Sequence, residues 1–250
     1  IYAREYDAAI SPNGNIPVHA FNLISPTFFA NSSTGNKYSL WVNVYGVSER
    51  YLNVYGEKDL RAQMNQFFHR TYTHPVDGTT LDMKMLCNWY WYDETAILET
   101  GKGTKDWNFY RYAETLLSAA EAIAQSSGVN AEAAGYLAQV KARANMEGKD
   151  VSTIASELQR LGKQAFIEEC WKERLREFPL EMKIWDDCVR TGKFPQISAT
   201  NKGEVQFVDL IGAKNGSGAT FKATDLYWPI PVNEIQRNPN LTQNEGYSAK

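Results

Sequence analysis

Residues 111–144 read RYAETLLSAAEAIAQSSGVNAEAAGYLAQVKARA, and their pattern decides the fold class. Apolar residues recur at the spacing of one helix face in both halves of the stretch. They stand at Tyr112, Leu116, Ala120 and Ile123 in the first half and at Ala134, Leu137, Val140 and Ala144 in the second. Between the halves, Gly128 favours the end of one helix and Asn130 the cap of the next. The stretch therefore predicts two helices packed as a hairpin.

The helical pattern continues as far as Gly192. A third, short helix is predicted to open at Ser152, a fourth to end or restart at Pro179, and a fifth to stop at Gly192. The apolar positions of these helices are Ile154, Leu158, Leu161, Phe166, Cys170, Trp171, Phe178, Leu180, Ile184 and Cys188. Helix pairs in series predict a mainly α fold of packed helical hairpins, a TPR-like α-α superhelix, although no clean second copy of a repeat unit is present.

The residues before the helices have a different composition. Residues 1–105 are rich in Asn, Gly, Ser, Thr and aromatic residues, and this predicts long loops carried on little regular structure. The alternation of Tyr2, Arg4 and Tyr6 predicts a strand, and one helix is expected at 59–69. We therefore separate this loop-rich aromatic region from a helical body at 106–192.

The last region, 193–250, is predicted to hold a small β-hairpin and an extended strap. The hairpin would pair EVQFVDL (204–210) with ATFKATDL (219–226) across the turn-rich AKNGSG. The strap reads YWPIPVNEIQRNPNLTQNEGY (227–247), and its prolines fix an extended backbone that leaves no room for another helix. With its aromatic and aliphatic side chains as anchors, we expect it to wrap the helical body and pin the end of the chain.

Composition excludes several classes of protein. The net charge of -3, with no long run of one sign, argues against binding to nucleic acid. No run reaches the roughly 20 apolar residues that span a bilayer. Cys87, Cys170 and Cys188 lack the spacing of a disulfide framework or a zinc site, so we interpret them as small buried hydrophobic residues. The sequence predicts neither a metal site nor a cofactor.

Four segments in the same order resemble the SusD/RagB family of outer-membrane nutrient-binding lipoproteins. They are RYAETLLSAAEA (111–122), YLAQVKARA (136–144), ERLREFPLEMKIWDDCVRTGK (173–193) and the strap. The loop-rich region resembles the family in its aromatic style and in the D-x-R of Asp59 and Arg61. Three positions depart from the family pattern. This chain has Met182 where the family has Gly, Ile184 where it has Arg and Glu245 where it has Pro. We interpret these as neutral changes in the structural framework, away from the binding site.

The resemblance implies a location and partners. The chain would be the C-terminal portion of one SusD-like domain in a protein about twice as long, whose N-terminal part carries a lipidated cysteine. The protein would be lipid-anchored in the outer membrane, facing the cell exterior, and the membrane contact would be made only through that anchor. Its ligand would be an oligosaccharide, delivered to a SusC-like TonB-dependent transporter.

The strongest candidate for ligand contact is KYSLWVNVYG, residues 37–46, which we call the aromatic platform. In an extended segment, alternation puts Trp41, Asn43 and Tyr45 on one face. Indole and phenol rings can stack on the flat face of a sugar, and an amide can both donate to and accept from its hydroxyl groups. Tyr38 is a weaker candidate nearby. The alternative is an ordinary edge strand with aromatic cross-strand pairs.

A second aromatic patch is CNWYWYDE, residues 87–94. If it is extended, Trp89 and Trp91 share one face, and one face of the segment must be buried to avoid a large exposed apolar patch. A packing role is therefore favoured for both tryptophans, which remain second-rank candidates for ligand binding.

Catalysis is not indicated. Adjacent acids such as Glu168 and Glu169 point in different directions on a helix and lack the facing geometry of a glycosidase pair. The three histidines belong to no catalytic or metal-binding motif. Two hypotheses remain: a non-enzymatic surface protein that binds glycan for transport, or a helical-repeat scaffold that grips a protein, with a peptide nutrient as an alternative cargo.

Overall fold

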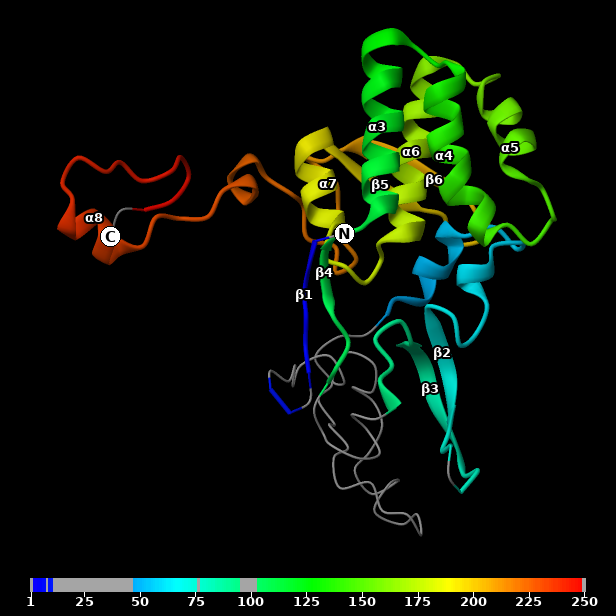
Figure 1. The fold of residues 1–250 in the computed structure, drawn as a ribbon. Coiled ribbons are helices and arrows are strands. Elements are labelled where there is room, and N and C mark those ends of the chain that lie inside the picture. Colours follow the sequence, from blue (N-terminus) through cyan, green and yellow to red (C-terminus); the bar gives the residue numbers. More distant parts are fainter. Residues whose placement is uncertain (1, 8, 11–46, 76, 95–102, 249–250) are drawn as a thin grey trace. The chain divides into compact units, whose positions relative to one another are not determined.

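The computed structural model describes residues 2–7, 9–10, 47–75, 77–94 and 103–248. The chain divides into two compact units, described here one at a time. Unit 1 comprises Ile1–Lys183 and Ile197–Val205, and unit 2 comprises Ile184–Gln196 and Gln206–Lys250. Unit 1 holds most of the helical body, and unit 2 holds the strap (Figure 1).

The predicted helical hairpin is confirmed. Helix α3 (Tyr112–Ser127) ends where Gly128 takes a φ of 81°, a conformation that favours glycine. Helix α4 (Ala131–Ala144) begins where the Asn130 side chain accepts a hydrogen bond from the Ala133 N–H at 2.9 Å. Side-chain capping of this kind satisfies a backbone donor that the helix itself leaves unpaired.

The other helices of the body follow the predicted order, but one cap differs, and Leu161 and Leu180, which were expected in helices, lie outside them. Helix α5 (Val151–Leu158) is capped by Asp150, whose carboxylate accepts from the Thr153 N–H, so the cap precedes the expected Ser152. Helix α6 (Lys163–Glu177) ends at Phe178, directly before Pro179. In unit 2, helix α7 (Ile184–Thr191) stops at Gly192 as predicted, and Gly192 has a φ of 66°.

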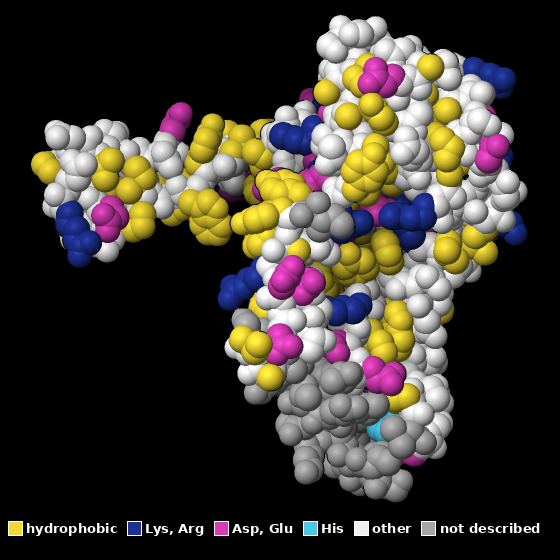
Figure 2. Space-filling model, viewed as in Figure 1, with side chains coloured by type: hydrophobic (Ala, Val, Ile, Leu, Met, Phe, Trp, Pro, Cys, Tyr) yellow, Lys and Arg dark blue, Asp and Glu magenta, His cyan; other side chains and the backbone are white. Residues whose placement is uncertain are grey.

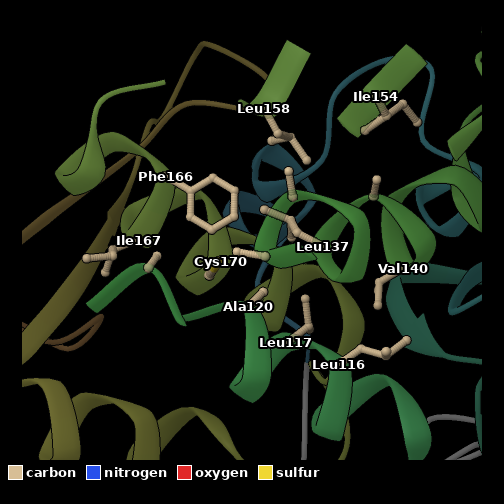
Figure 3. Packing of buried hydrophobic residues seen from close by; sticks show 14 of the residues in the cluster. Leu116, Leu117, Ala120, Leu137, Val140, Ile154, Leu158, Phe166, Ile167 and Cys170 are labelled. Carbon is tan, nitrogen blue, oxygen red and sulfur yellow. The ribbon is translucent and has the colours of Figure 1, made fainter. Parts of the chain in front are cut away.

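The core of unit 1 lies where α3, α4, α5 and α6 pack together. Figure 3 shows its centre, where Leu117, Leu137 and Phe166 are fully buried. Ala120 and Ala134 are also fully buried, and small side chains of this kind let two helices approach closely. Ile154 and Leu158 close the cluster from α5. Apart from Tyr112, which is 63% exposed, the apolar spacing in the sequence therefore identifies the core-facing side of these helices.

Two small sheets belong to unit 1. Strand β1 (Tyr2–Arg4), predicted from its alternation, pairs antiparallel with β4 (Trp107–Tyr110). Strand β2 (Phe68–Thr73) pairs antiparallel with β3 (Thr80–Asn88).

The prediction of a helix over 59–69 is wrong. Two 3-10 helices, η1 (Glu49–Val54) and η2 (Leu60–Ala62), precede β2, and the Asp59 carboxylate caps η2 by accepting from the Arg61 N–H. Phe68 and Tyr72 are buried on the β2–β3 pair, so tertiary pairing outweighs a weak local preference for helix.

Unit 2 differs from the predicted hairpin. Strand β6 (Val205–Asp209) exists, but it pairs with β5 (Lys193–Ile197), which follows α7 directly. The segment expected to pair with β6 instead contains the 3-10 helix η4 (Ala223–Leu226). A local turn does form, since Lys214 and Thr220 make an isolated bridge. The predicted turn therefore forms, but β6 pairs with β5 and not with the segment at 219–226.

The strap also contains a short helix that its prolines seemed to exclude, α8 (Val232–Arg237), which begins after Pro231. Proline is tolerated at a helix start because the donor it lacks would be unpaired there anyway. Around α8 the strap closes on itself: the Gln243 amide donates to the Ile230 carbonyl and accepts from the Ile230 N–H, both at 2.8 Å. Figure 2 shows hydrophobic side chains gathered along the strap. Its wrapping of the helical body stays a prediction.

All three cysteines are buried and free, as predicted from their positions. Burial raises the pKa of the Cys87 thiol to about 12 and that of Cys188 to about 11, and it also raises the pKa of Cys170. These thiols therefore stay protonated at neutral pH. Of the helices within the described ranges, none combines the length and apolar character needed to span a bilayer.

Candidate functional site

The aromatic patch at 87–94 forms a cluster at the end of strand β3. The strand ends at Asn88, and the next residue turns back because the Trp89 N–H donates to the Phe67 carbonyl at 2.8 Å. The alternation assumed for a continuous strand therefore breaks here. As a result, Trp89 and Trp91 have different environments.

Trp91 belongs to the core. It is 4% exposed, its indole N–H donates to the Leu180 carbonyl at 3.1 Å, and its ring stacks on Trp107 with a centroid distance of 5.0 Å. Both the ring and its donor are thus used within unit 1. The structure gives Trp91 the packing role that the sequence had favoured, and this corrects its place among the candidate ligand contacts.

Trp89, unlike Trp91, is only partly buried. It is half-buried and stacks on Tyr92 with a centroid distance of 4.2 Å and an interplanar angle of 8°. His69 lies on β2 with its ring centroid 4.8 Å from that of Trp89. We call Trp89 and Tyr92 the stacked pair. It presents two nearly parallel flat rings supported by a buried histidine.

The phenols of this cluster are neutral hydrogen-bonding groups. Burial raises the pKa of Tyr72 to about 12, and burial together with the neighbouring Tyr72 raises the pKa of Tyr92 as well. The Tyr92 hydroxyl donates to a carboxylate oxygen of Glu94 at 3.0 Å. A neutral phenol can both donate and accept, as recognition of sugar hydroxyls requires.

The aromatic platform lies outside the described residues. Trp41, Asn43, Tyr45 and Tyr38 all fall in this part of the chain. Their role therefore stays a prediction. The sequence placed Tyr92 in the aromatic patch, but alternation put it on the face opposite Trp89, and nothing in the sequence placed His69 beside the patch. Tyr92 lies three residues after Trp89, so ending the strand at Asn88 would have brought the two rings to the same side of a turn.

A buried ionic network fixes the loop before β2 to helix α6. Arg61 is 6% exposed, and its guanidinium contacts Asp59 at 2.7 Å, Glu173 at 2.9 Å and Glu177 at 3.0 Å. The Tyr55 hydroxyl adds a bond to the Arg176 carbonyl at 3.0 Å. The D-x-R pair noted in the sequence is thus a structural clamp, and it lines a cavity of about 430 Å³ in unit 1.

Three arginines share one carboxylate at the end of α6. Glu177 accepts from Arg61, from Arg111 at 2.9 Å and from Arg143. Arg111 also forms a two-pronged contact with Glu181, at 2.8 and 2.6 Å. This cluster borders a second cavity, of about 330 Å³, between α3 and α4.

The adjacent acids of the sequence serve as ion-pair partners. Glu169 contacts Lys141 at 2.5 Å and Arg176 at 2.9 Å, and Asp187 accepts from Arg190 at 2.7 Å. Carboxylates held in this way brace the helices. Within the described residues, no group of three or more His, Cys, Asp or Glu side chains has a geometry suited to a metal ion.

Comparison with known proteins identifies the family and several relatives of this chain. The SusD family model matches residues 31–247. The starch-binding protein SusD of Bacteroides thetaiotaomicron is 36% identical over 138 residues, which are 55% of this chain and 21% of that protein. A crystal structure of a SusD superfamily protein from Parabacteroides distasonis is 28% identical with a TM-score of 0.78, covering 99% of this chain and 50% of that one.

A further structure shows the same fold at lower identity. Surface glycan-binding protein A from Bacteroides uniformis is 21% identical with a TM-score of 0.62, over 98% of this chain and 48% of that chain. The chain thus spans half or less of the length of these relatives. Because the family match extends over residues 31–247 of 250, the chain belongs to the SusD family.

Proposed function

We propose that this chain is part of a cell-surface protein that binds an oligosaccharide without changing it chemically. The observation that carries the proposal is the family match over residues 31–247. The relatives support it, since one is named a starch-binding protein and another a surface glycan-binding protein. The bound glycan would pass to a SusC-like TonB-dependent transporter, with a lipid anchor in the N-terminal part of the protein holding it at the outer membrane.

The stacked pair gives this proposal a physical basis. Trp89 and Tyr92 lie parallel and are half-buried. A pyranose ring can pack against the exposed part of these aromatic rings. Aromatic contacts contribute on the order of 1 kcal/mol each, so binding through a few of them is weak and reversible. Reversible binding suits a protein that hands its cargo onward. Trp41, Asn43 and Tyr45 of the aromatic platform would add the other contacts.

The charged groups of the body support a non-enzymatic role. Glu173 and Glu177 are buried in ion pairs, so neither is placed to give or take a proton from a substrate. A glycosidase needs two carboxylates facing each other across a sugar, roughly 5 to 10 Å apart and open to the substrate.

Calorimetric titration of oligosaccharides tests the proposal. Maltoheptaose is the first probe because one relative is named for starch, and a panel of other neutral oligosaccharides follows. The full chain is compared with Trp41→Ala and Trp89→Ala, and Trp228→Ala is the matched control because Trp228 is 89% exposed and lies on the strap. We expect the first two variants to weaken binding about fivefold or more, and the control to bind as the parent does. Equal binding by all variants would contradict a role for Trp41 and Trp89 in binding the oligosaccharide.

A protein-binding scaffold is the second candidate. The packing of α3 against α4 and α6 favours it, because serial helix pairs often present a surface to a protein or peptide. This candidate predicts that the oligosaccharide panel shows no binding while immobilised peptides or an isolated transporter bind. Analysis of the bound glycan after incubation detects cleavage, and any cleavage would contradict a non-enzymatic role.

A further inference from the structure

We infer that the groove between the first turn of α3 and the last turn of α4 is a binding site for an acidic sugar residue, a hexuronate of a charged oligosaccharide. The inference rests on the proposed glycan-binding function and names a substrate class for it. The groove has a volume of about 330 Å³, within the roughly 300–1,000 Å³ of small-molecule sites. It lies within unit 1.

The groove combines an apolar floor with an exposed ring. Leu116 and Val140 form part of its floor and are 7% and 3% exposed. Tyr112 stands at its side with 63% of its surface exposed. An apolar floor beside an accessible ring suits the flat CH face of a sugar. Gln139 adds an exposed amide for the hydroxyl groups.

The charge of the groove selects an anion. Among the described residues that line it, the charged side chains are Arg111 and Arg143. Arg111 is occupied by Glu177 and Glu181, whereas the Arg143 side chain is 58% exposed. In the described part of the chain, Arg143 uses only Nη2, toward Glu177. Its Nε, its Nη1 and the second N–H of Nη2 therefore remain to donate to a ligand.

Arg143 is also held in position. Its Nη2 contacts Glu177, a carboxylate that Arg61 and Arg111 fix from two other elements. A guanidinium held at one nitrogen loses less entropy when its remaining donors bind. The second N–H of Nη2 lies in one plane with a donor of Nη1 or Nε, and such a fork matches a carboxylate. A carboxylate attached to a pyranose ring would place that ring over the apolar floor beside Tyr112.

Trigalacturonic acid and its methyl ester are the probes, because they differ in charge and share the sugar chain. We expect the full chain to bind the acid at least tenfold more tightly than the ester, and Arg143→Gln to abolish that preference. Arg160→Gln is the matched control, since Arg160 is also an exposed arginine and lies outside the groove. Tyr112→Ala should weaken binding of both probes.

Equal binding of acid and ester by the full chain, or identical behaviour of Arg143→Gln and Arg160→Gln, overturns the inference. Thermal unfolding of each variant verifies that it folds. If Arg143→Gln is unstable, Tyr112→Ala and Gln139→Ala test the groove in its place, because both side chains are exposed. If neutral oligosaccharides bind through Trp41 or Trp89 and the acid is not preferred, the proposed function is supported and the groove is not the binding site. If only the acid binds, and its binding depends on Arg143, the groove is supported as the binding site and a binding role for the aromatic platform is contradicted.

Discussion

Arg61 on η2 donates through Nη1 to Oε2 of Glu177 at the end of α6, at 3.0 Å, and both side chains are almost fully buried. The contact joins the loop before β2 to the helical body within unit 1. Because Arg61 also contacts Asp59 and Glu173, its charge is neutralised on three sides. The pair is therefore part of a network whose members depend on one another.

Removal of one partner from this network is expected to be costly. Arg61→Leu removes the buried cation that Asp59, Glu173 and Glu177 share, and breaking a buried pair in this way typically costs about 3–5 kcal/mol. We expect a loss of at least about 3 kcal/mol in the free energy of unfolding, measured by urea denaturation. The control is Arg70→Leu, since the Arg70–Glu49 pair is 43% and 58% exposed and such pairs contribute about 0–1 kcal/mol. Equal losses in the two variants would contradict a structural role for the clamp.

Stability should fall at acid pH through Glu173. Burial by itself would raise the pKa of Glu173, but the charges of Arg61, Lys141 and Arg176 outweigh it and hold the pKa well below its usual range. Since the folded pKa is depressed, the stabilisation is complete above about pH 5 and is lost as the pH falls below the unfolded pKa of about 4.3.

Urea unfolding at a series of pH values between 7 and about 3 measures this dependence. We expect Glu173→Gln to be less stable than the parent at pH 7, and its stability to decline less steeply below about pH 5. Glu49→Gln, which alters the exposed pair, should retain most of the parent's slope. A parent-like slope in Glu173→Gln would show that other acids dominate the acid unfolding.

Met182 occupies a position that favours glycine. Its φ is 58°, its side chain is 63% exposed, and the SusD family pattern has Gly there. Left-handed backbone costs a side-chain-bearing residue about 1–2 kcal/mol, while glycine loses more entropy on folding. We therefore expect Met182→Gly to stabilise the protein by about 0.5–1 kcal/mol in thermal or urea unfolding. Met146→Gly is the control: Met146 is 46% exposed with φ outside that region, so glycine should destabilise there.

Gly246 should be intolerant of a side chain. It has a φ of 85°, and an added Cβ would come within 2.1 Å of Cγ2 of Thr224. Gly246→Ala should break the hydrogen bonds from the Tyr247 hydroxyl to the Thr224 and Tyr227 carbonyls, at 3.0 and 2.8 Å. Limited proteolysis and hydrogen exchange over 224–247 should then show faster cleavage and exchange.

The strap prediction has its own control and rescue. Gly216→Ala should leave the strap intact, because no heavy atom lies within 4 Å of a Cβ added there. A double variant, Gly246→Ala with Thr224→Ser, removes the methyl group that clashes and should recover part of the protection. Strap protection that is unchanged in Gly246→Ala would show that the closure does not depend on this turn.

The helical body was predictable because its signals are local. Leu116, Ala120, Leu137 and Val140 stand at helical spacing and are buried, and Gly128 and Asn130 mark a stop and a start that the structure reproduces. The spacing of side chains and the chemistry of caps depend on a few consecutive residues. For the same reason Pro179 and Gly192 marked helix ends correctly.

The rest depended on distant contacts. Strand β6 pairs with β5, and nothing in EVQFVDL distinguishes that partner from the segment at 219–226. The separation of Trp89 from Trp91 follows from a hydrogen bond to Phe67, made by a chain reversal that the run of aromatics conceals. The sharing of Glu177 by Arg61, Arg111 and Arg143 joins three separate elements, so no single stretch of sequence could reveal it.

The burial of the three cysteines has a practical consequence for following cargo capture. A thiol must ionise to react with maleimide, and Cys87, Cys170 and Cys188 are buried with raised pKa values. A new cysteine engineered on the surface would therefore be labelled selectively, without removal of the native ones. A fluorophore attached beside the groove or the stacked pair would then report, one molecule at a time, which of them an arriving sugar chain occupies first.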